Sequence, residues 1–338
     1  MVGDAAGILR QRAKGKSRYK VKSKKVEVRT GLVPVPHGTD KIMKKALTIA
    51  LVIIITTIPA IAQLRVMTYN ILTGFDWNQD STRGTKLIEW LNIQKPDVLA
   101  LEEMNGFTPE RLAEFAKKWG HDYSAIAKTD GYPVAITSNK PIIVKERLLE
   151  GMWHGMLHCE THGIDFFVVH LSPADWQFRK CEAQAICEKI EQTASETDEY
   201  IVLGDFNAHS PFDAEFNRKY PYQLERYRKR DTTSTKYKNL HNGEYDYSVL
   251  STFLALSLID VCDRYVPMDG RTTCPTPLNV PQWLTTEEME KTKHRIDFIL
   301  VSPELAQKCT GAWIFNGPEN YYLSDHYPVM AEFEHNNY

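Results

Sequence analysis

The chain has 338 residues, with 41 Lys and Arg against 43 Asp and Glu, 43% hydrophobic residues and 25% charged residues. These proportions are typical of a globular protein and exclude a disordered, collagen-like or polytopic membrane chain. The formal net charge of -2 hides an asymmetry, because residues 1–45 carry 13 basic and 3 acidic residues while residues 46–338 carry 28 and 40.

Residues 43–62 have the pattern of a secretory signal peptide. Two lysines precede an uncharged apolar run over 46–62, which contains Pro59 and ends in a small-x-small triplet. We therefore expect cleavage before Gln63 and a periplasmic or secreted protein. The run has 17 residues, at the lower limit for a membrane span, so an uncleaved anchor is the alternative. Residues 1–42 form a basic extension that is either untranslated, with initiation at Met43, or an arm that contacts anionic lipid or nucleic acid.

The remaining chain, 63–338, alternates predicted strands with predicted helices. Several strand segments are apolar throughout, as expected for strands covered on both faces. No linker rich in Gly, Ser or Pro divides this region, so we expect one domain of packed sheets with helices outside. In chain order the predicted strands are 64–70, 97–102, 134–137, 164–170, 200–204, 295–301 and 327–333; the predicted helices are 85–94, 109–119 and 176–192; and 138–141 is interpreted as a hairpin connection.

The predicted helix at 176–192 has an apolar stripe. Its spacing places Phe178, Cys181, Ala185, Ile186 and Ile190 near the face that we expect to be buried. All six cysteines of the chain follow the expected cleavage point, and two interpretations of them stay open: disulfides of an exported protein, or small buried hydrophobic residues.

A basic segment interrupts the acidic domain. Residues 217–238 contain 8 Lys and Arg, 2 acidic residues and four tyrosines. One interpretation is a solvated surface insertion. The other is an arm that binds a polyanion through charge and stacking, for which Arg228, Lys229 and Arg230 are the candidates.

Polar side chains recur where predicted apolar strands end. Several such ends at one edge of a sheet would form a cluster of carboxylates, amides and imidazoles. Carboxylate and amide oxygens without a nearby thiolate suit Mg²⁺ or Mn²⁺ better than zinc. Histidines beside such a metal suit reactions in which negative charge develops on phosphate. The residues concerned are Asn70, Glu103, His170, Asp205, Asn207, Asp297, Asp325 and His326.

The motifs that carry these residues occur in a diagnostic order: MTYNI, ALEEM, VVHLSP, GDFNAHSP, HRIDFIL and SDHYPV. Over residues 64–333 the chain resembles the endonuclease/exonuclease/phosphatase (DNase I-like) family. The resemblance implies an α/β fold, a four-layered sandwich of two packed, mainly antiparallel β-sheets flanked by helices. It also implies hydrolysis of a phosphoester that depends on Mg²⁺, with Mn²⁺ as a possible substitute.

The resemblance assigns a metal site and a base. Glu103 would be the principal metal ligand, with Asn70 and Asp325 close to the metal. Asp205 would orient or deprotonate the attacking water, and Asn207 would help to hold the phosphate.

Two histidines would complete the catalytic set. His326, hydrogen-bonded to Asp297, would act on the phosphate, and His170 would contact a phosphate oxygen or assist the leaving group. Relatives of the DNase I type pair the first histidine with a Glu on a preceding strand. Residues 132–134 offer no such Glu, which leaves the acid role of His170 open.

Three further substrate contacts are expected. Trp153 and His154 are placed at the mouth of the cleft, and Arg295 precedes the strand that carries Asp297. Glu102 is not assigned to the metal, because neighbouring residues on a strand point to opposite faces.

The leading hypothesis is an exported metal-dependent phosphodiesterase, with nucleic acid as the first substrate class. The charge of residues 63–338, with 28 basic and 40 acidic groups, disfavours broad non-specific binding to nucleic acid but leaves a local patch possible. The alternatives are a phosphatase or phospholipase-type phosphodiesterase acting on inositol phosphate, sugar phosphate or sphingomyelin, and an inactive binding protein with the same fold. No obligate protein partner is indicated, and membrane contact is expected only through an uncleaved 46–62.

Overall fold

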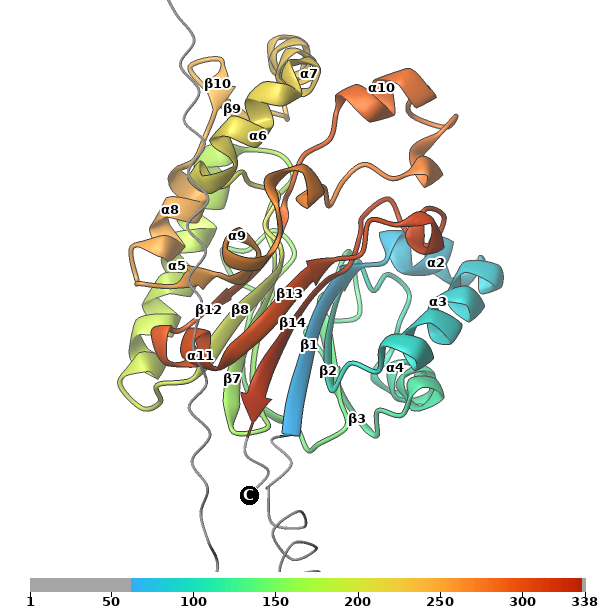
Figure 1. The fold of residues 1–338 in the computed structure, drawn as a ribbon, viewed down its shortest axis with the longest axis vertical. Coiled ribbons are helices and arrows are strands. Elements are labelled where there is room, and N and C mark those ends of the chain that lie inside the picture. Colours follow the sequence, from blue (N-terminus) through green and yellow to red (C-terminus); the bar gives the residue numbers. More distant parts are fainter. Residues whose placement is uncertain (1–61, 336–338) are drawn as a thin grey trace, which may run out of the picture. The chain divides into compact units, whose positions relative to one another are not determined.

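The computed structural model describes residues 62–335, which contain two six-stranded sheets that pack face to face, with helices outside (Figure 1). This confirms the predicted α/β sandwich. The first sheet has the order β13-β14-β1-β2-β4-β3 and the second β11-β12-β8-β7-β6-β5. In each sheet only the two central strands are parallel to each other, β1 with β2 and β7 with β8.

The strands have the following bounds. The first sheet contains β1 (Ala62–Asn70), β2 (Val98–Glu102), β3 (Tyr123–Ile126), β4 (Ala135–Ser138), β13 (Cys309–Ile314) and β14 (Val329–His335). The second contains β5 (Ile143–Leu148), β6 (Met156–Thr161), β7 (Ile164–His170), β8 (Tyr200–Asp205), β11 (Ile259–Asp260) and β12 (Asp297–Val301). A separate two-stranded ribbon pairs β9 (Leu240–His241) with β10 (Glu244–Tyr245).

The helices lie between these strands in sequence. They are α2 (Leu72–Asn78), α3 (Ser81–Gln94), α4 (Pro109–Ala116), α5 (Trp176–Ala194), α6 (Ala214–Lys219), α7 (Pro221–Thr233), α8 (Ser248–Leu254), α9 (Val261–Tyr265), α10 (Thr286–Lys291) and α11 (Pro303–Lys308). Short 3₁₀ turns occupy Lys117–Trp119, Pro211–Asp213, Met268–Gly270, Pro277–Asn279 and Pro318–Asn320.

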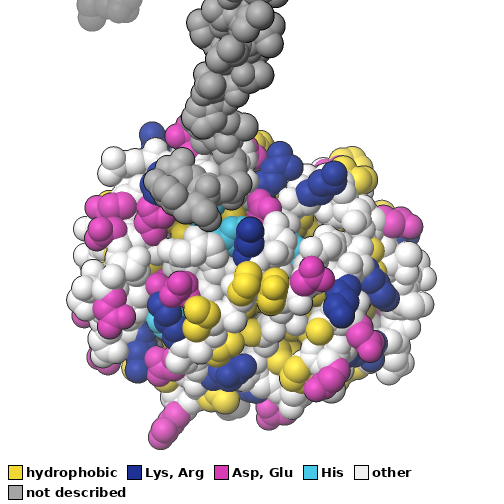
Figure 2. All heavy atoms as spheres, turned by 90° about the horizontal axis from the view of Figure 1, so that it is seen from below, with side chains coloured by type: hydrophobic (Ala, Val, Ile, Leu, Met, Phe, Trp, Pro, Cys, Tyr) yellow, Lys and Arg dark blue, Asp and Glu magenta, His cyan; other side chains and the backbone are white. Residues whose placement is uncertain are grey.

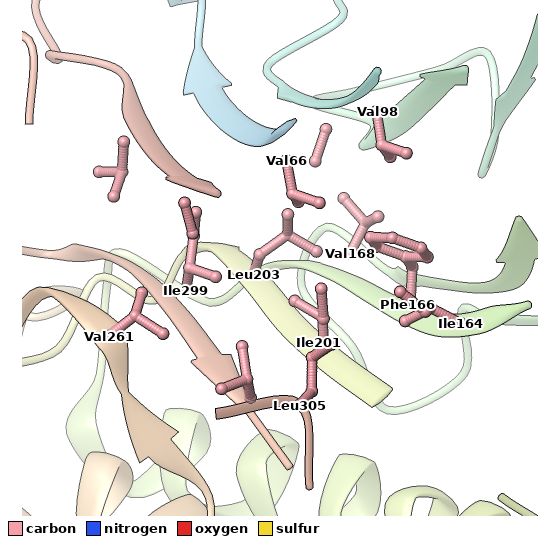
Figure 3. Packing of buried hydrophobic residues seen from close by; sticks show 14 of the residues in the cluster. Val66, Val98, Ile164, Phe166, Val168, Ile201, Leu203, Val261, Ile299 and Leu305 are labelled. Carbon is pink, nitrogen blue, oxygen red and sulfur yellow. The ribbon is translucent and has the colours of Figure 1, made fainter. Parts of the chain in front are cut away.

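Three layers of apolar side chains hold the sandwich together. Side chains such as Val66, Phe166 and Leu203 fill the space between the sheets (Figure 3). Alternate residues of β1 point the other way, so Met67 joins a second cluster beneath α3 and α4. A third cluster, which includes Ile186, lies between the second sheet and helices α5 and α8. Because the central strands are buried on both faces, they read as continuous apolar runs in the sequence.

All seven predicted strands and all three predicted helices are present, with ends shifted by a few residues. The hairpin prediction at 138–141 is wrong. β4 pairs within the first sheet and β5 within the second, so this connection crosses between the sheets. The sequence pattern did not reveal β5 because this edge strand alternates exposed and half-exposed residues instead of forming an apolar run.

The predicted N-terminal segments 1–42 and 43–61 lie outside the described residues. Within 62–335, no helix has both the length and the apolarity needed to cross a membrane. The six cysteines are all free thiols, and Cys159, Cys187, Cys262 and Cys309 are buried, in line with the interpretation that they serve as small hydrophobic residues. The end of the domain where β1 begins carries interspersed acidic and basic side chains (Figure 2).

Candidate active site

Strand register brings the candidate residues together at the edge where β1, β2, β7 and β8 end. His170 and Asp205 are direct partners in the parallel β7–β8 pair. Asp205 is also the cross-strand partner of Asp297, the first residue of β12. β1 ends at Asn70, and Glu103 follows the last residue of β2. Residues far apart in the chain therefore meet because the strands that carry them end at one edge.

Asp205 lies at the centre of this cluster. Its Oδ2 accepts a hydrogen bond from Asn70 Nδ2 at 3.1 Å and lies 3.5 Å from His170 Nε2 and 3.9 Å from His326 Nε2. Its Oδ1 accepts the Asn207 backbone N–H at 2.8 Å. Burial, reinforced by repulsion from Asp297, raises the pKa of Asp205 to about 7. A carboxylate with a pKa near neutrality suits proton abstraction from water.

Glu103 lies on the side of the cluster that the first sheet contributes. It has a left-handed φ of 59°, and its carboxylate accepts Asn70 Nδ2 at 3.3 Å and the Thr73 backbone N–H at 2.7 Å. Glu102 is fully buried and accepts the Thr68 hydroxyl at 2.7 Å, so it faces away from Glu103, as predicted. Burial and repulsion from Asp325 raise the pKa of Glu103.

A left-handed helical turn, α2, delivers the Thr73 N–H. All seven of its residues have positive φ, a conformation that costs about 1–2 kcal/mol per non-glycine residue. A Cβ on Gly74 would lie 2.1 Å from the Asn105 carbonyl oxygen, so this position accepts only glycine. Strain of this kind persists where the surrounding structure enforces it, and here it orients Glu103.

The donor set fits a hard divalent cation. Asp325 repels the Glu103 carboxylate. Within the described residues, the positively charged group that lowers the pKa of Glu103 is His326, not a Lys or Arg. Glu103 and Asp325 would hold a divalent cation, whose charge would offset this repulsion. Asn70 lies next to Glu103, the expected metal ligand: its Oδ1 accepts the Leu72 N–H at 3.0 Å, while its Nδ2 donates to Glu103 and Asp205. It links the two carboxylates instead of offering a free oxygen.

A second group could also hold a cation, since ligand atoms of Asp205, Asp297 and His326 lie within 4.8 Å of one another. We favour the Glu103–Asp325 pair. His326 Nδ1 already lies 2.9 Å and 3.1 Å from the two oxygens of Asp297, which engages both groups. Although burial opposes it, attraction to Asp297 raises the pKa of His326 well above its usual value. The predicted contact between His326 and Asp297 is therefore present, and the other ring nitrogen of His326 faces Asp205.

His170 has no carboxylate partner at its second nitrogen. It is buried, its Nδ1 lacks a hydrogen-bond partner within the described residues, and its ring stacks on His154 with centroids 4.0 Å apart. Burial, with smaller contributions from His154 and His326, lowers the pKa of His170 well below its usual value. A neutral imidazole suits a hydrogen bond to a phosphate oxygen better than acid catalysis. The predicted Trp153 lies beside this stack, 37% exposed, with its ring centroid 6.4 Å from that of His154.

Glu182 of α5 supports both of these histidine-bearing loops, and the sequence pattern did not reveal it. Its side chain is buried and accepts backbone N–H groups from Trp153 at 2.7 Å and Ser172 at 2.8 Å. Burial raises the pKa of Glu182 to about 7. The buried face of α5 is rotated from the predicted one, because Arg179 and Glu182 are buried while Phe178 and Cys181 are exposed.

The prediction that Arg295 contacts substrate is wrong. Its side chain is fully buried and forms 2.6 Å ion pairs with Asp213 and Asp260. Its guanidinium also lies 4.4 Å from the centre of the Phe298 ring. Arg295 therefore anchors the start of β12 beneath the site, where no substrate can reach it.

Of the three basic candidates on α7, only Arg230 faces the site. It lines a cavity of about 390 Å³ that also includes Asn207, Asp325 and His326. Arg228 instead pairs with Glu225 and Glu244 on the exposed side of the helix, and Lys229 is exposed. The cavity lining also includes Arg226, Trp283 and His294, which sequence reasoning did not select. Arg226 lies within the basic segment, but its orientation depends on helix phase and could not be taken from charge alone.

Comparisons with known proteins agree with this architecture. The model of the Endonuclease/Exonuclease/phosphatase family matches residues 67–326. Similar solved structures include an AP endonuclease from Archaeoglobus fulgidus (18% identity, TM-score 0.59, covering 80% of this chain and 99% of that one). The 3'-5' exonuclease NExo from Neisseria meningitidis is similar at 20% identity and a TM-score of 0.60 over 80% of this chain and 100% of that one. At these identities, structural likeness shows the fold alone. No curated protein sequence matches. Because the family model spans most of the chain, the protein belongs to the endonuclease/exonuclease/phosphatase family.

Proposed function

We propose that the protein is a divalent-metal-dependent phosphodiesterase that hydrolyses its substrate by in-line attack of water. The observation that carries this proposal is the convergence of Glu103, Asp205 and the Asp297–His326 pair at one edge of the sandwich. Each expected position holds a group able to perform its part, which argues against an inactive binding protein on this fold.

Residues of the first sheet and of the loop before β14 form the cation site. Glu103 and Asp325 would bind Mg²⁺ or Mn²⁺, which when bound supplies neutralisation of the phosphate charge. Asn70 donates to both Glu103 and Asp205 and fixes their separation. This positioning is what an in-line phosphoryl reaction requires of a protein.

Residues of the second sheet handle the protons. Asp205 takes a proton from the attacking water, and Asn207 is oriented toward the phosphate by its Nδ2 bond to Leu171 O at 3.0 Å and its N–H bond to Asp205. His326, charged beside Asp297, stabilises the developing negative charge. His170, neutral and stacked on His154, donates to a phosphate oxygen.

Nucleic acid is the substrate class we favour. Its support comes from the titles of similar structures, an AP endonuclease, a 3'-5' exonuclease and a 3' phosphatase bound to a product DNA hairpin, and from the cationic wall on α7. A matched test assays the purified protein and its Asp205→Asn variant with Mg²⁺ on bis-p-nitrophenyl phosphate, plasmid DNA, RNA and sphingomyelin. Cleavage of nucleic acid by the unsubstituted protein alone supports the proposal. If the protein cleaves sphingomyelin but neither DNA nor RNA, the substrate class is a phospholipid and not nucleic acid. Absence of metal-dependent activity on all four substrates would refute the proposed function.

We further propose that the protein is exported after cleavage before Gln63. The support is the signal-peptide pattern of residues 43–62, together with the position of that bond at the start of β1. N-terminal sequencing of the native protein tests it: a mature chain that begins at Gln63 is expected. A chain that retains 46–62 and stays with membranes after carbonate washing would contradict export and indicate an anchor.

A further inference from the structure

The cavity beside the catalytic cluster has a lining that catalysis does not explain. Asn207, Asp325 and His326 belong to the site already described. Arg226 and Arg230 of α7 line the same cavity, which therefore combines a carboxylate and catalytic groups with two guanidinium groups. With about 390 Å³, it has room for more than the phosphate that reacts.

Arg230 is held in place but lacks an acceptor. Its guanidinium carbon lies 4.8 Å from the centre of the Tyr227 ring and 5.0 Å from that of Tyr237. Its Nε is buried and has no hydrogen-bond partner within the described residues. A buried donor without an acceptor is costly and unusual in a folded protein. The two tyrosine rings thus orient a guanidinium that lines the cavity and forms no ion pair within the described residues.

Helix phase divides the positive charge of α7 between two faces. Arg226 and Arg230 are four residues apart and lie on the same face, toward the cavity. Arg226 makes only a 3.5 Å contact with Gln223 Oε1. Arg228 lies between them in sequence, on the other side, where Glu225 and Glu244 neutralise it. Of the three arginines of α7, the two on the cavity face, Arg226 and Arg230, form no ion pair within the described residues, whereas Arg228 does.

The segment before α10 supplies another wall of the cavity. Trp283, 54% exposed, and Leu284 line it. The Tyr222 hydroxyl of α7 donates to Glu288 Oε1 of α10 at 3.2 Å, which links the two helices. Figure 1 shows α7 and α10 on the side of the sheets where β1 and β2 end. An aromatic face next to two guanidinium groups suits a ligand with a flat or sugar moiety and an anionic group.

We propose that Arg226 and Arg230 form a subsite for a second phosphate, on the residue adjacent to the phosphoester that is hydrolysed. The inference rests on the proposed function, because it takes the catalytic cluster to bind the first phosphate. Guanidinium groups match phosphate oxygens in a planar, two-donor geometry. A dinucleotide step and a sugar bisphosphate share this chemistry, so the subsite selects substrates with two phosphates over isolated phosphodiesters.

Binding to the full chain carrying Asp205→Asn tests the subsite without turnover. Calorimetry with Mg²⁺ compares dTpdT, which has only the internal phosphodiester, with pdTpdT and dTpdTp, which add a phosphate on either side. Fructose 1,6-bisphosphate represents the small-molecule source. We expect at least one of the three bisphosphorylated probes to bind about ten- to a hundredfold more tightly than dTpdT. This is the gain expected from charge-assisted hydrogen bonds to the second phosphate.

Substitutions on one helix provide matched controls. Arg230→Gln and, separately, Arg226→Gln should each reduce the preference for the second phosphate, whereas Arg228→Gln should leave it unchanged, since that side chain faces Glu225 and Glu244. Thermal unfolding of each variant shows whether the fold is retained. The preference should weaken at higher salt.

The outcomes separate the subsite from the proposed function. Equal binding of all probes, or a preference that survives both Arg226→Gln and Arg230→Gln in folded protein, overturns the subsite. Tighter binding of the sugar bisphosphate than of either phosphorylated dinucleotide supports the subsite and identifies a small-molecule substrate. A preference that depends on Arg230, in a chain whose unsubstituted form hydrolyses none of the probes, supports the subsite and refutes the proposed function.

Discussion

The two sheets of this protein have the same arrangement of strands but contribute different chemistry. Each places a parallel pair, β1–β2 or β7–β8, at its centre, with antiparallel strands on both sides. At the end of the first pair, Glu103, which directly follows β2, offers a carboxylate suited to a cation, and Asn70, the last residue of β1, donates to it. The second ends at His170 and Asp205, groups suited to proton transfer and phosphate binding. The same architecture thus supplies charge neutralisation on one side and proton chemistry on the other, which makes the two halves separable by experiment.

Asp205→Asn should have the largest effect. It removes the base of the second sheet, and we expect the turnover rate to fall by about 10²- to 10⁴-fold. Because the Asn70 contact and the cation site remain, added Mg²⁺ or Mn²⁺ should not restore activity. Steady-state kinetics on bis-p-nitrophenyl phosphate over a metal titration measures both effects, with thermal unfolding as the control for folding. Recovery at high metal concentration would contradict the assignment of Asp205 as the base.

Glu103→Gln should weaken the cation site at the end of the first sheet without removing the base. The neutral amide keeps the shape of the side chain but weakens attraction to a divalent cation, so the metal concentration for half-maximal activity should rise by at least about tenfold. Activity should return as the metal concentration increases. EDTA should abolish the activity of the unsubstituted protein, and Mg²⁺ or Mn²⁺ should restore it. A variant with an unchanged metal requirement would place the cation elsewhere, with Asp205, Asp297 and His326 as the alternative ligands.

The pH dependence of the rate should show how strongly a cation bound at Glu103 affects the protonation of Asp205. Burial and Asp297 raise the pKa of Asp205 to about 7, and the base must be deprotonated to act. The rate should therefore fall about tenfold per unit as the pH drops below that pKa and level off above it. A bound cation favours the charged carboxylate and should move this limb to lower pH as the metal concentration rises. If the Asp205→Asn variant shows the same decrease in rate at low pH, that decrease reflects the titration of another group.

Glu182→Gln should have the smallest effect of the four. Glu182 contacts no substrate, and it positions the loops of Trp153 and Ser172 through backbone N–H groups. An amide offers one acceptor oxygen for two donors, so we expect a loss of about tenfold in kcat/KM. The metal requirement, a property of the first half, should not change. Measuring kcat, KM and the metal titration together distinguishes positioning from a general loss of fold, which would alter all three.

Sequence patterns predicted the parts that depend on strand ends. The central strands are apolar on both faces and are therefore conspicuous. The polar residues at or directly after their ends, Glu103, His170 and Asp205, could be selected before their contacts were known. Their roles came from family resemblance, since strand ends alone do not reveal which ends meet. Registers such as Asp205 with Asp297 are a property of the assembled sheet.

Residues that act through tertiary packing could not be predicted. Arg295 and Arg230 are both basic residues near catalytic motifs, yet one is fully buried against Asp213 and Asp260 while the other lines the cavity. Charge does not distinguish them, because the difference lies in which acidic groups the fold brings nearby. Glu182 was missed for a related reason: a single Glu on a helix usually faces solvent, and only the packed loops give it two N–H partners.

The most direct test of the division between the sheets is one metal titration of phosphodiester hydrolysis performed on the unsubstituted protein, Glu103→Gln and Asp205→Asn. We expect the unsubstituted protein to be saturated at low metal concentration, Glu103→Gln to reach substantial activity only at high metal concentration, and Asp205→Asn to stay inactive throughout. Metal-independent hydrolysis by the unsubstituted protein, or rescue of Asp205→Asn but not of Glu103→Gln, would contradict this division.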